Sequence, residues 1–241
     1  FSYTRQIEMK GLGHAILCGE NLIGNQPFAV LLADDLCDAP DKGVLSQMVE
    51  LYKKYNCSIV AIEEIPKEDT NKYGVIAGNE IEPGIFMVKD MVEKPEPEVA
   101  PSNLAIIGRY ILTPDIFDII RETKPGKGGE IQITDALLTQ AKNGMVLAYK
   151  FKGERFDCGS IDGFVKATNY FYDKETKKEE VDARKPQISD TIISMLNSKK
   201  PEELLKKEGK EYLKEEVKTS INNFLVDGQV TDIYYVGFQI N

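Results

Sequence analysis

The chain has 241 residues, of which 42% are hydrophobic, which is enough to bury the core of one domain and a small second unit. Its formal net charge of −9 argues against a nucleic-acid-binding surface. Four cysteines lie far apart without C-x-x-C spacing, which favours reduced cytosolic thiols over disulfides or zinc. There is no signal-peptide pattern, and no apolar run reaches the roughly 20 residues of a membrane span, so we expect a cytoplasmic protein.

Helical patterns alternate with apolar strand patterns over the first 172 residues. In chain order, they predict a helix from Gly11, a strand over 28–33, a helix over 43–55, a strand over 57–64, strands around 85–92 and 104–112, helices from Pro114 and Glu130, a strand over 145–151 and a helix over 160–172. This alternation predicts an α/β fold with a mostly parallel sheet.

Glycines precede the first predicted helix. Gly11 and Gly13 allow close backbone approach, and the free amides at a helix start attract anions. A tight connection without a ligand is the alternative interpretation.

In two segments of the chain, aspartates directly follow a strand-like run. The apolar run 28–33 ends in Asp34 and Asp35, and much later Phe156 is followed by Asp157. One aspartate from each segment could share a hard cation through oxygen ligands, with water and phosphate completing the shell, as magnesium prefers. The alternative is that each aspartate only caps a helix or forms an Asx-turn.

A further strand-like run, over 85–88, is soon followed by Glu93, Lys94 and Pro95. A lysine at the carboxyl end of a strand, stiffened by the following proline, suits a fixed phosphate contact. A solvated pair of neighbouring charges is the alternative.

Taken together, these motifs resemble one family between residues 4 and 170. They are K-G-L-G-H-A (10–15), L-A-D-D (32–35), K-Y-G-V (72–75), M-V-E-K-P (91–95), A-P-S-N-L-A (100–105), G-R-Y (108–110), G-E-I-Q-I-T-D-A (129–136) and F-D-C-G (156–159). In this order they are similar to the bacterial UTP-glucose-1-phosphate uridylyltransferases, or UDP-glucose pyrophosphorylases. The resemblance implies an incomplete Rossmann-like nucleotidyltransferase domain over residues 1–174. It also implies UMP transfer from UTP to glucose 1-phosphate, giving UDP-glucose and pyrophosphate with Mg²⁺ as cofactor.

The resemblance also implies roles for individual residues. The catalytic residues would be Lys94 and Asp34, and the metal ligands Asp34 and Asp157. The sugar-phosphate site would comprise Gly74, Glu93 and Lys94, and the nucleotide site Gln6, Gly11 and Asp34. The only histidine, His14, would have a structural role at the helix start. The alternative, a general base, is not needed, because the attacking phosphate oxygen is already anionic at neutral pH. Because the chain's net charge is negative, binding of such a polyanionic substrate must be local, through Lys94, Arg109 and the metal.

The chain departs from the family pattern at its start, because the family's loop reading roughly G-x-G-T-R, which cradles the triphosphate, does not occur in these 241 residues. We therefore expect that this polypeptide alone does not turn over UTP. Relatives that use dTTP share the Lys94 motif, so a dTTP-using sugar nucleotidyltransferase remains an alternative. A homo-oligomer is compatible with the sequence.

The remaining residues, 175–241, have a different character. After a charged run over 175–180, apolar positions at 188, 192 and 195–196 predict one helix. A second helix is expected from Pro201 to Leu225, then a turn at Asp227–Gly228 and a strand over 230–240. A helical oligomerisation tail is one interpretation of this small α+β segment.

Residues 181–241 also resemble the carboxyl end of FliL-type flagellar basal-body proteins, on K-P-Q-I-S-D-T-I-I-S (185–194), P-E-E-L (201–204), E-G-K (208–210) and V-T-D-I-Y-Y (230–235). Those proteins carry this domain in the periplasm and associate with the flagellar stator. The alternative function is therefore a stator-associated interaction module. Since the two resemblances imply different compartments, the simplest interpretation is a fragment of one protein joined to a fragment of another.

Overall fold

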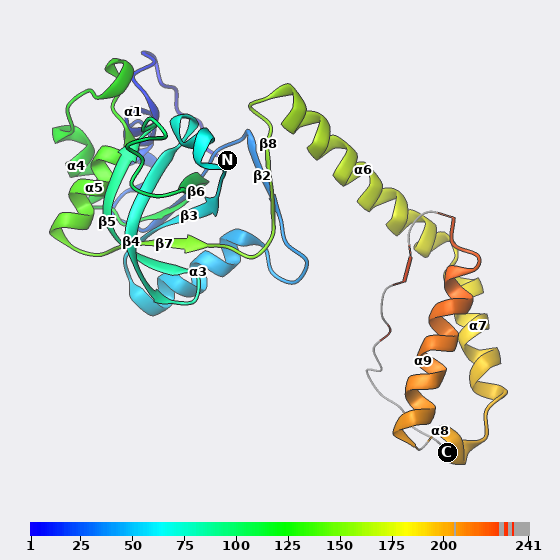
Figure 1. Cartoon of the computed structure of the whole chain (residues 1–241). Coiled ribbons are helices and arrows are strands. Elements are labelled where there is room, and N and C mark those ends of the chain that lie inside the picture. The colour runs from blue at the N-terminus through cyan, green and yellow to red at the C-terminus, as the bar shows by residue number, and fades with distance from the viewer. Residues whose placement is uncertain (205, 227–228, 231–232, 234–241) are drawn as a thin grey trace. The chain divides into compact units, whose positions relative to one another are not determined.

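The computed structural model describes residues 1–204, 206–226, 229–230 and 233. By its internal contacts the chain divides into two compact units, residues 1–164 and 165–241 (Figure 1). The predicted boundary at residue 174 stays a prediction. Within the described residues, no helix is both long and apolar enough to cross a membrane.

The first unit contains eight described strands and five described α-helices. The strands are β1 (Phe28–Leu31), β2 (Asp35–Asp38), β3 (Ser58–Glu64), β4 (Gly74–Glu82), β5 (Ile85–Glu93), β6 (Leu104–Leu112), β7 (Val146–Lys150) and β8 (Glu154–Asp157). The helices are α1 (Leu12–Leu17), α2 (Glu20–Ile23), α3 (Val44–Tyr55), α4 (Ile116–Glu122) and α5 (Ile133–Asn143), with 3₁₀ turns η1 (Lys67–Lys72) and η2 (Lys127–Gly129). The predicted α/β class and the predicted helices and strands of this unit are confirmed.

Six strands form the central sheet in the order β1-β6-β3-β7-β5-β4, and β4 also pairs with β6. The expectation of a mostly parallel sheet is wrong for the part of the chain that the structure describes. There only β3 and β7 pair in parallel, and the other pairings are antiparallel. One antiparallel pair, β4 and β5, is a hairpin closed by a tight turn in which Gly84 has a φ of +75°. Strand β4 was not predicted from the sequence, and its second half is rich in polar residues.

Helices cover both faces of the sheet, which explains why the apolar pattern of the strands suggested a mostly parallel sheet. On one face, α1, α4 and α5 pack over a core that includes Val60 and Ile62. On the other face, α3 packs through Val44 and Met48 over a core that includes Ile59. A strand that is buried on both faces is continuously apolar, and this pattern does not specify whether its neighbours run parallel or antiparallel.

The second unit is helical in its described part. Its helices are α6 (Ile161–Ala183), which begins in the first unit, α7 (Lys185–Asn197), α8 (Pro201–Leu204) and α9 (Lys207–Asn222). Leu204, Leu213, Val217 and Ile221 form its buried core, and Ile188 and Ile192 pack against them. The helix predicted around Ile188 is confirmed, but the helix predicted from Pro201 to Leu225 is divided into α8 and α9.

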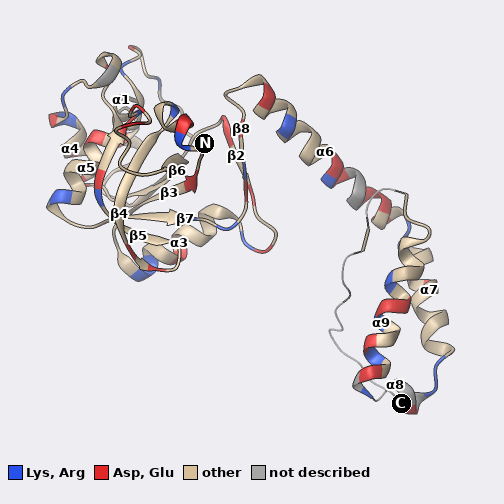
Figure 2. Ribbon diagram, viewed as in Figure 1, with Lys and Arg blue, Asp and Glu red and all other residues tan. Residues whose placement is uncertain are grey.

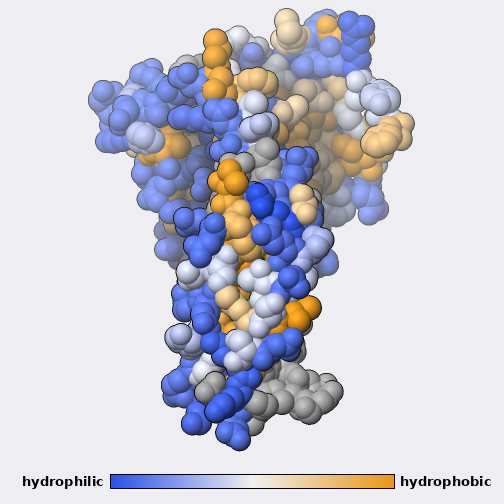
Figure 3. Space-filling view, turned by 90° about the vertical axis from the view of Figure 1, so that its right-hand side faces the viewer, coloured by the Kyte–Doolittle hydropathy of each residue, from blue (hydrophilic) through white to orange (hydrophobic). Residues whose placement is uncertain are grey.

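Residue 206, between α8 and α9, has an extended backbone with φ −82° and ψ 147°. The predicted turn at 227–228 lies outside the described residues, as does the predicted strand over 230–240 apart from Val230 and Ile233. Among the described residues, basic and acidic side chains are both spread along α6 and α9 (Figure 2). The molecular face in Figure 3 is mostly hydrophilic, with apolar side chains dispersed over it.

Candidate active site

A pocket of about 350 Å³ opens in the first unit. Its lining includes Asp34, Gly74, Glu93, Lys94 and Asp157, which are the residues predicted to hold metal and sugar phosphate. Residues separated by more than 120 positions in the sequence therefore meet around one cavity. This is the convergence that the motifs predicted.

Asp34 and Asp157 meet through a two-stranded ribbon that the sequence analysis did not predict. Strands β2 and β8 pair antiparallel, with Asp35 opposite Asp157. The Cys158 amide donates to the Asp34 carbonyl at 2.7 Å, which extends the pairing by one step. Asp34 Oδ2 and Asp157 Oδ1 lie 3.5 and 3.1 Å from the point that a Cβ on Gly159 would occupy. The two carboxylates thus face a common space beside a residue without a side chain.

The adjacent Asp35 has a different environment. It is buried, and its carboxylate accepts a hydrogen bond from the Gly108 amide at 2.7 Å and pairs with Arg155 Nε at 2.5 Å. Its oxygens therefore hold protein groups in place, which leaves Asp34 as the aspartate of this pair that can reach a ligand.

Asp157 is held in its ionised form. Burial alone would raise the pKa of Asp157, but hydrogen bonds from the Tyr73 hydroxyl and the Gly159 amide, together with the charge of Arg155, hold that pKa below its usual value. The same surroundings act in the opposite direction on Tyr73, whose pKa is raised by burial and by the bond to Asp157. An ionised Asp157 is the form that can bind a cation.

Lys94 has an unusual backbone. Its φ of +48° lies in the left-handed region, which a residue with a Cβ adopts only at a cost. Its amide donates to the Tyr73 carbonyl at 3.0 Å, and its Nζ lies 3.9 Å from Glu93 Oε1. Such strain concentrates at ligand-binding positions, because the surrounding structure must enforce it.

Glu93 is positioned by α5. Thr134 Oγ1 donates to Glu93 Oε2 at 2.9 Å. A Cβ on Gly74 would lie 2.6 Å from Thr134 Cγ2 and 3.2 Å from Glu93 Oε2. Gly74 thus permits the close packing of β4 against α5 and leaves space for the Glu93 carboxylate.

The predicted nucleotide residues Gln6 and Gly11 lie beside the pocket. Gln6 Nε2 donates to the Gly11 carbonyl at 3.1 Å and lies 2.9 Å from His14 Nδ1. Gly11 has a φ of +89° and packs against Glu130, which lines the pocket. The contact with Gln6 is compatible with the predicted structural role of His14.

The expectation that Arg109 faces the substrate is wrong. Arg109 is buried, and its guanidinium donates to the backbone carbonyls of Leu32, Asp35 and Gly108. It anchors the segment that connects β1 and β2. The pocket-lining cations are Lys72, Lys94 and Arg155.

Sequence reasoning missed Tyr73, Thr134 and Arg155 as site residues, although each lies within or next to a motif that it had used. Arg155 precedes Asp157 by two residues on one strand, and this spacing places both side chains on the same face. This two-residue spacing was the sequence feature that could have identified Arg155 as a site residue. The contacts of Tyr73 and Thr134 depend on distant segments and had no local signal.

The charges of the lining fit a magnesium ion. Five carboxylates and three cations line the pocket, so phosphate groups require an additional cation there. Among the described residues no cluster of three or more His, Cys, Asp and Glu side chains could hold a metal. Two carboxylates, Asp34 and Asp157, suit Mg²⁺, which keeps several waters and takes substrate phosphates as further ligands.

A family model described as Nucleotidyl transferase matches residues 1–175. The chain belongs to this family. A second model, described as Flagellar basal body-associated protein FliL, matches residues 163–240. Both resemblances inferred from the motifs are confirmed.

Individual members of the nucleotidyl transferase family agree with this assignment. The UTP-glucose-1-phosphate uridylyltransferase of Pseudomonas aeruginosa is 70% identical over 174 residues, which are 72% of this chain and 62% of that protein. A putative enzyme of the same name from Methanocaldococcus jannaschii is 47% identical over 165 residues, 68% of this chain and 57% of the relative. A structure of UDP-glucose pyrophosphorylase complexed with UDP-glucose matches with a TM-score of 0.71 and 66% identity, over 72% of this chain and 66% of that one. The chain thus spans about 62% of the length of its Pseudomonas relative.

Proposed function

We propose that the first unit provides the metal- and sugar-phosphate-binding part of a UTP-glucose-1-phosphate uridylyltransferase site. The reaction would join UMP from UTP to glucose 1-phosphate, giving UDP-glucose and pyrophosphate. The observation that carries this proposal is the single pocket that gathers Asp34, Asp157, Glu93 and Lys94.

In this proposal the protein acts by alignment and charge neutralisation, because phosphoryl-type transfer needs little covalent chemistry from the enzyme. Lys94 would bind the phosphate of glucose 1-phosphate and direct its anionic oxygen at the α-phosphorus of UTP. Asp34 and Asp157 would hold Mg²⁺, which when bound offsets charge on the phosphate oxygens. No general base is required, because the attacking oxygen carries no proton to remove.

Substrate recognition would use the remaining residues around the pocket. Glu93, oriented by Thr134, would accept hydrogen bonds from glucose hydroxyls, and Gly74 would let the backbone approach the sugar. Gln6 and Gly11 would face the base. These contacts do not decide between uracil and thymine, so dTTP remains a second nucleotide to test. The substrates are cytosolic metabolites, which would place this unit in the cytoplasm.

Calorimetric titration of the whole chain with UDP-glucose and Mg²⁺ tests the proposal. Asp34→Ala and Lys94→Ala should each weaken binding about tenfold or more, since hydrogen bonds to charged groups contribute about 1.5–3 kcal/mol. Lys150→Ala is the matched control, because Lys150 lies outside the pocket and its side chain is 47% exposed, as is that of Lys94. Equal binding by all three variants would contradict the proposal.

The activity of this chain by itself is a separate question. We expect no pyrophosphate release from UTP and glucose 1-phosphate, because no segment of these 241 residues matches the G-x-G-T-R loop. Robust turnover by the purified chain would show that expectation to be wrong, while leaving the binding proposal intact.

We also propose an interaction role for the second unit. The match of residues 163–240 to the FliL model favours it, together with the separate apolar core of Leu204, Leu213, Val217 and Ile221. The unit would associate with a stator-type protein or with another copy of itself, independently of nucleotide. Sedimentation velocity of the full chain, with and without UDP-glucose, tests self-association, and a mass that changes with UDP-glucose would contradict independence.

A further inference from the structure

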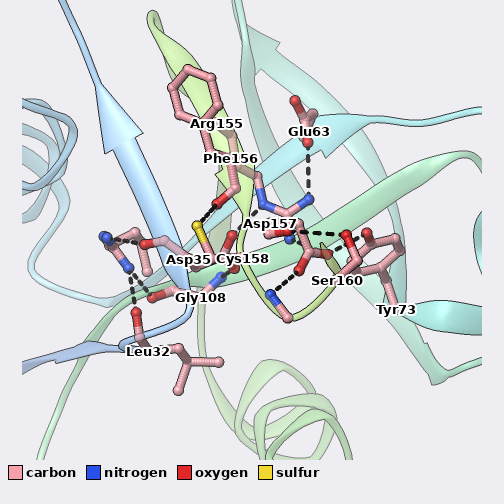
Figure 4. A network of polar contacts seen from close by, with 12 residues as sticks. Leu32, Asp35, Glu63, Tyr73, Gly108, Arg155, Phe156, Asp157, Cys158 and Ser160 are labelled. Carbon is pink, nitrogen blue, oxygen red and sulfur yellow. Dashed lines mark hydrogen bonds and ion pairs between the residues drawn. The ribbon is translucent and has the colours of Figure 1, made fainter. Parts of the chain in front are cut away.

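Arg155 has an environment that the proposed chemistry does not yet explain. Its side chain is 7% exposed and contacts three carboxylates. Nε lies 2.5 Å from Asp35 Oδ1, Nη1 lies 3.3 Å from Glu63 Oε2, and Nη2 lies 3.2 Å from Asp157 Oδ2 (Figure 4). A planar guanidinium presents its donors in fixed directions, so these contacts fix the carboxylates relative to one another.

Tyr73 completes the arrangement around Asp157. The Arg155 guanidinium lies 5.1 Å from the centre of the Tyr73 ring, and the Tyr73 hydroxyl donates to Asp157 Oδ2 at 2.7 Å (Figure 4). Oδ2 of Asp157 therefore receives two side-chain donors. The other oxygen, Oδ1, faces the space shared with Asp34 Oδ2 beside Gly159.

Asp35, the carboxylate that Arg155 contacts through Nε, is fixed to the central sheet. Asp35 faces Asp157 across the β2–β8 ribbon, and its other oxygen is bound by the Gly108 amide of the central sheet. Arg155 thus connects a carboxylate fixed by the sheet to the carboxylate that faces the pocket.

We propose that Arg155 is a positioning residue: it holds Asp157 so that Oδ1 is presented, together with Asp34, to a divalent cation. This inference rests on the proposed function, in which both aspartates bind the metal. In this role Arg155 acts through Asp157, although its side chain also lines the pocket. Residues that orient metal ligands in this way typically change metal affinity 10–100-fold when they are replaced.

A purely electrostatic role is the competing explanation, and a charge-matched variant separates the two. Arg155→Met alone leaves Asp35, Glu63 and Asp157 without a compensating charge. The double variant Arg155→Met/Glu63→Gln has the same net charge over these four residues as the native protein, but it lacks the guanidinium. Glu63 is outside the pocket lining, which makes it suitable for this replacement.

The experiment measures Mn²⁺ affinity of the full chain by electron paramagnetic resonance of free Mn²⁺, without nucleotide, and thermal unfolding of the same samples. We expect Arg155→Met/Glu63→Gln to unfold at a lower temperature than the native protein, because Asp35 loses its buried partner. Measured well below its own unfolding temperature, the double variant should bind Mn²⁺ about tenfold more weakly than the native protein. Arg155→Lys should retain part of the affinity, because lysine keeps the charge but not the planar donors. Asp34→Asn is the reference for loss of a direct ligand.

Native Mn²⁺ affinity in Arg155→Met/Glu63→Gln, with binding lost in Asp34→Asn, would overturn the role of Arg155 and leave the proposed function intact. Unchanged affinity in Asp34→Asn would overturn both. If the double variant does not fold, Arg155→Lys decides: reduced affinity at an unchanged unfolding temperature supports positioning, and native affinity refutes it.

Discussion

Replacing Gly74 by alanine should destabilise the first unit. A Cβ at this position would lie 2.6 Å from Thr134 Cγ2, whereas carbon atoms in favourable contact are about 3.5–4.0 Å apart. The buried first part of β4 or helix α5 must therefore move by about 1 Å. Overpacking of this kind typically costs about 1–3 kcal/mol of unfolding free energy.

Thr134→Ser provides the matched background. It removes the Cγ2 methyl that would clash but keeps the hydroxyl that donates to Glu93. Thr134→Ser alone should lower the unfolding free energy by about 1 kcal/mol, because it removes a methyl group from a buried side chain. With this methyl absent, the nearest atoms to the new Cβ are Glu93 Oε2 at 3.2 Å and Ile106 Cδ1 at 3.4 Å, so Gly74→Ala should cost less than about 1 kcal/mol.

The assay is hydrogen exchange with mass spectrometry in increasing urea, using peptides from β3 and β6, which report the first unit alone. The double-mutant cycle should show a coupling of about 1–2 kcal/mol between positions 74 and 134. A neutral Gly74→Ala, or two additive substitutions, would refute the inferred contact.

The same cycle separates folding from binding. In the Thr134→Ser background the alanine methyl still lies 3.2 Å from Glu93 Oε2. UDP-glucose binding should therefore stay weakened although most of the stability cost of the alanine itself is relieved. Native UDP-glucose affinity in the double variant would show that Gly74 serves packing alone.

Three further predictions concern single residues. Burial raises the pKa of Cys57 to about 11, so mass spectrometry should find this thiol alkylated by iodoacetamide at pH 8 far more slowly than Cys18. Lys94→Gly should stabilise the first unit by up to about 1 kcal/mol in urea, because glycine tolerates positive φ, while weakening UDP-glucose binding. The lowered pKa of Asp157 stabilises the fold above the unfolded-state pKa of about 3.9, and this contribution is lost as the pH falls through the folded-state value. Asp157→Asn should therefore flatten the decline of unfolding free energy between about pH 5 and pH 2; an unchanged slope would contradict the inferred contacts.

Much of the functional assignment was available from local sequence. Short motifs identified the family. Residue type and position at strand ends marked Asp34, Asp35, Asp157 and the Glu93–Lys94 pair as candidates, and the resemblance assigned their roles. Helices such as α3 were predicted because their apolar spacing is a local property: Val44 and Met48 lie one turn apart. These features depend on residues close together in the chain, which is why pattern alone was sufficient.

Strand direction and the polar network depended on the tertiary structure. Helices on both faces give β3 the same apolar composition whether its neighbours run parallel or antiparallel, so the sequence could not specify the mixed sheet. The β2–β8 ribbon pairs residues more than 100 positions apart. Asp34 and Asp35 both line the pocket, but the ribbon sets the Asp35 carboxylate against Arg155, whereas Asp34 shares a space with Asp157. Sequence thus determined which chemical groups are present, and long-range backbone pairing decided which of them line one pocket and which of them are bonded to other protein groups.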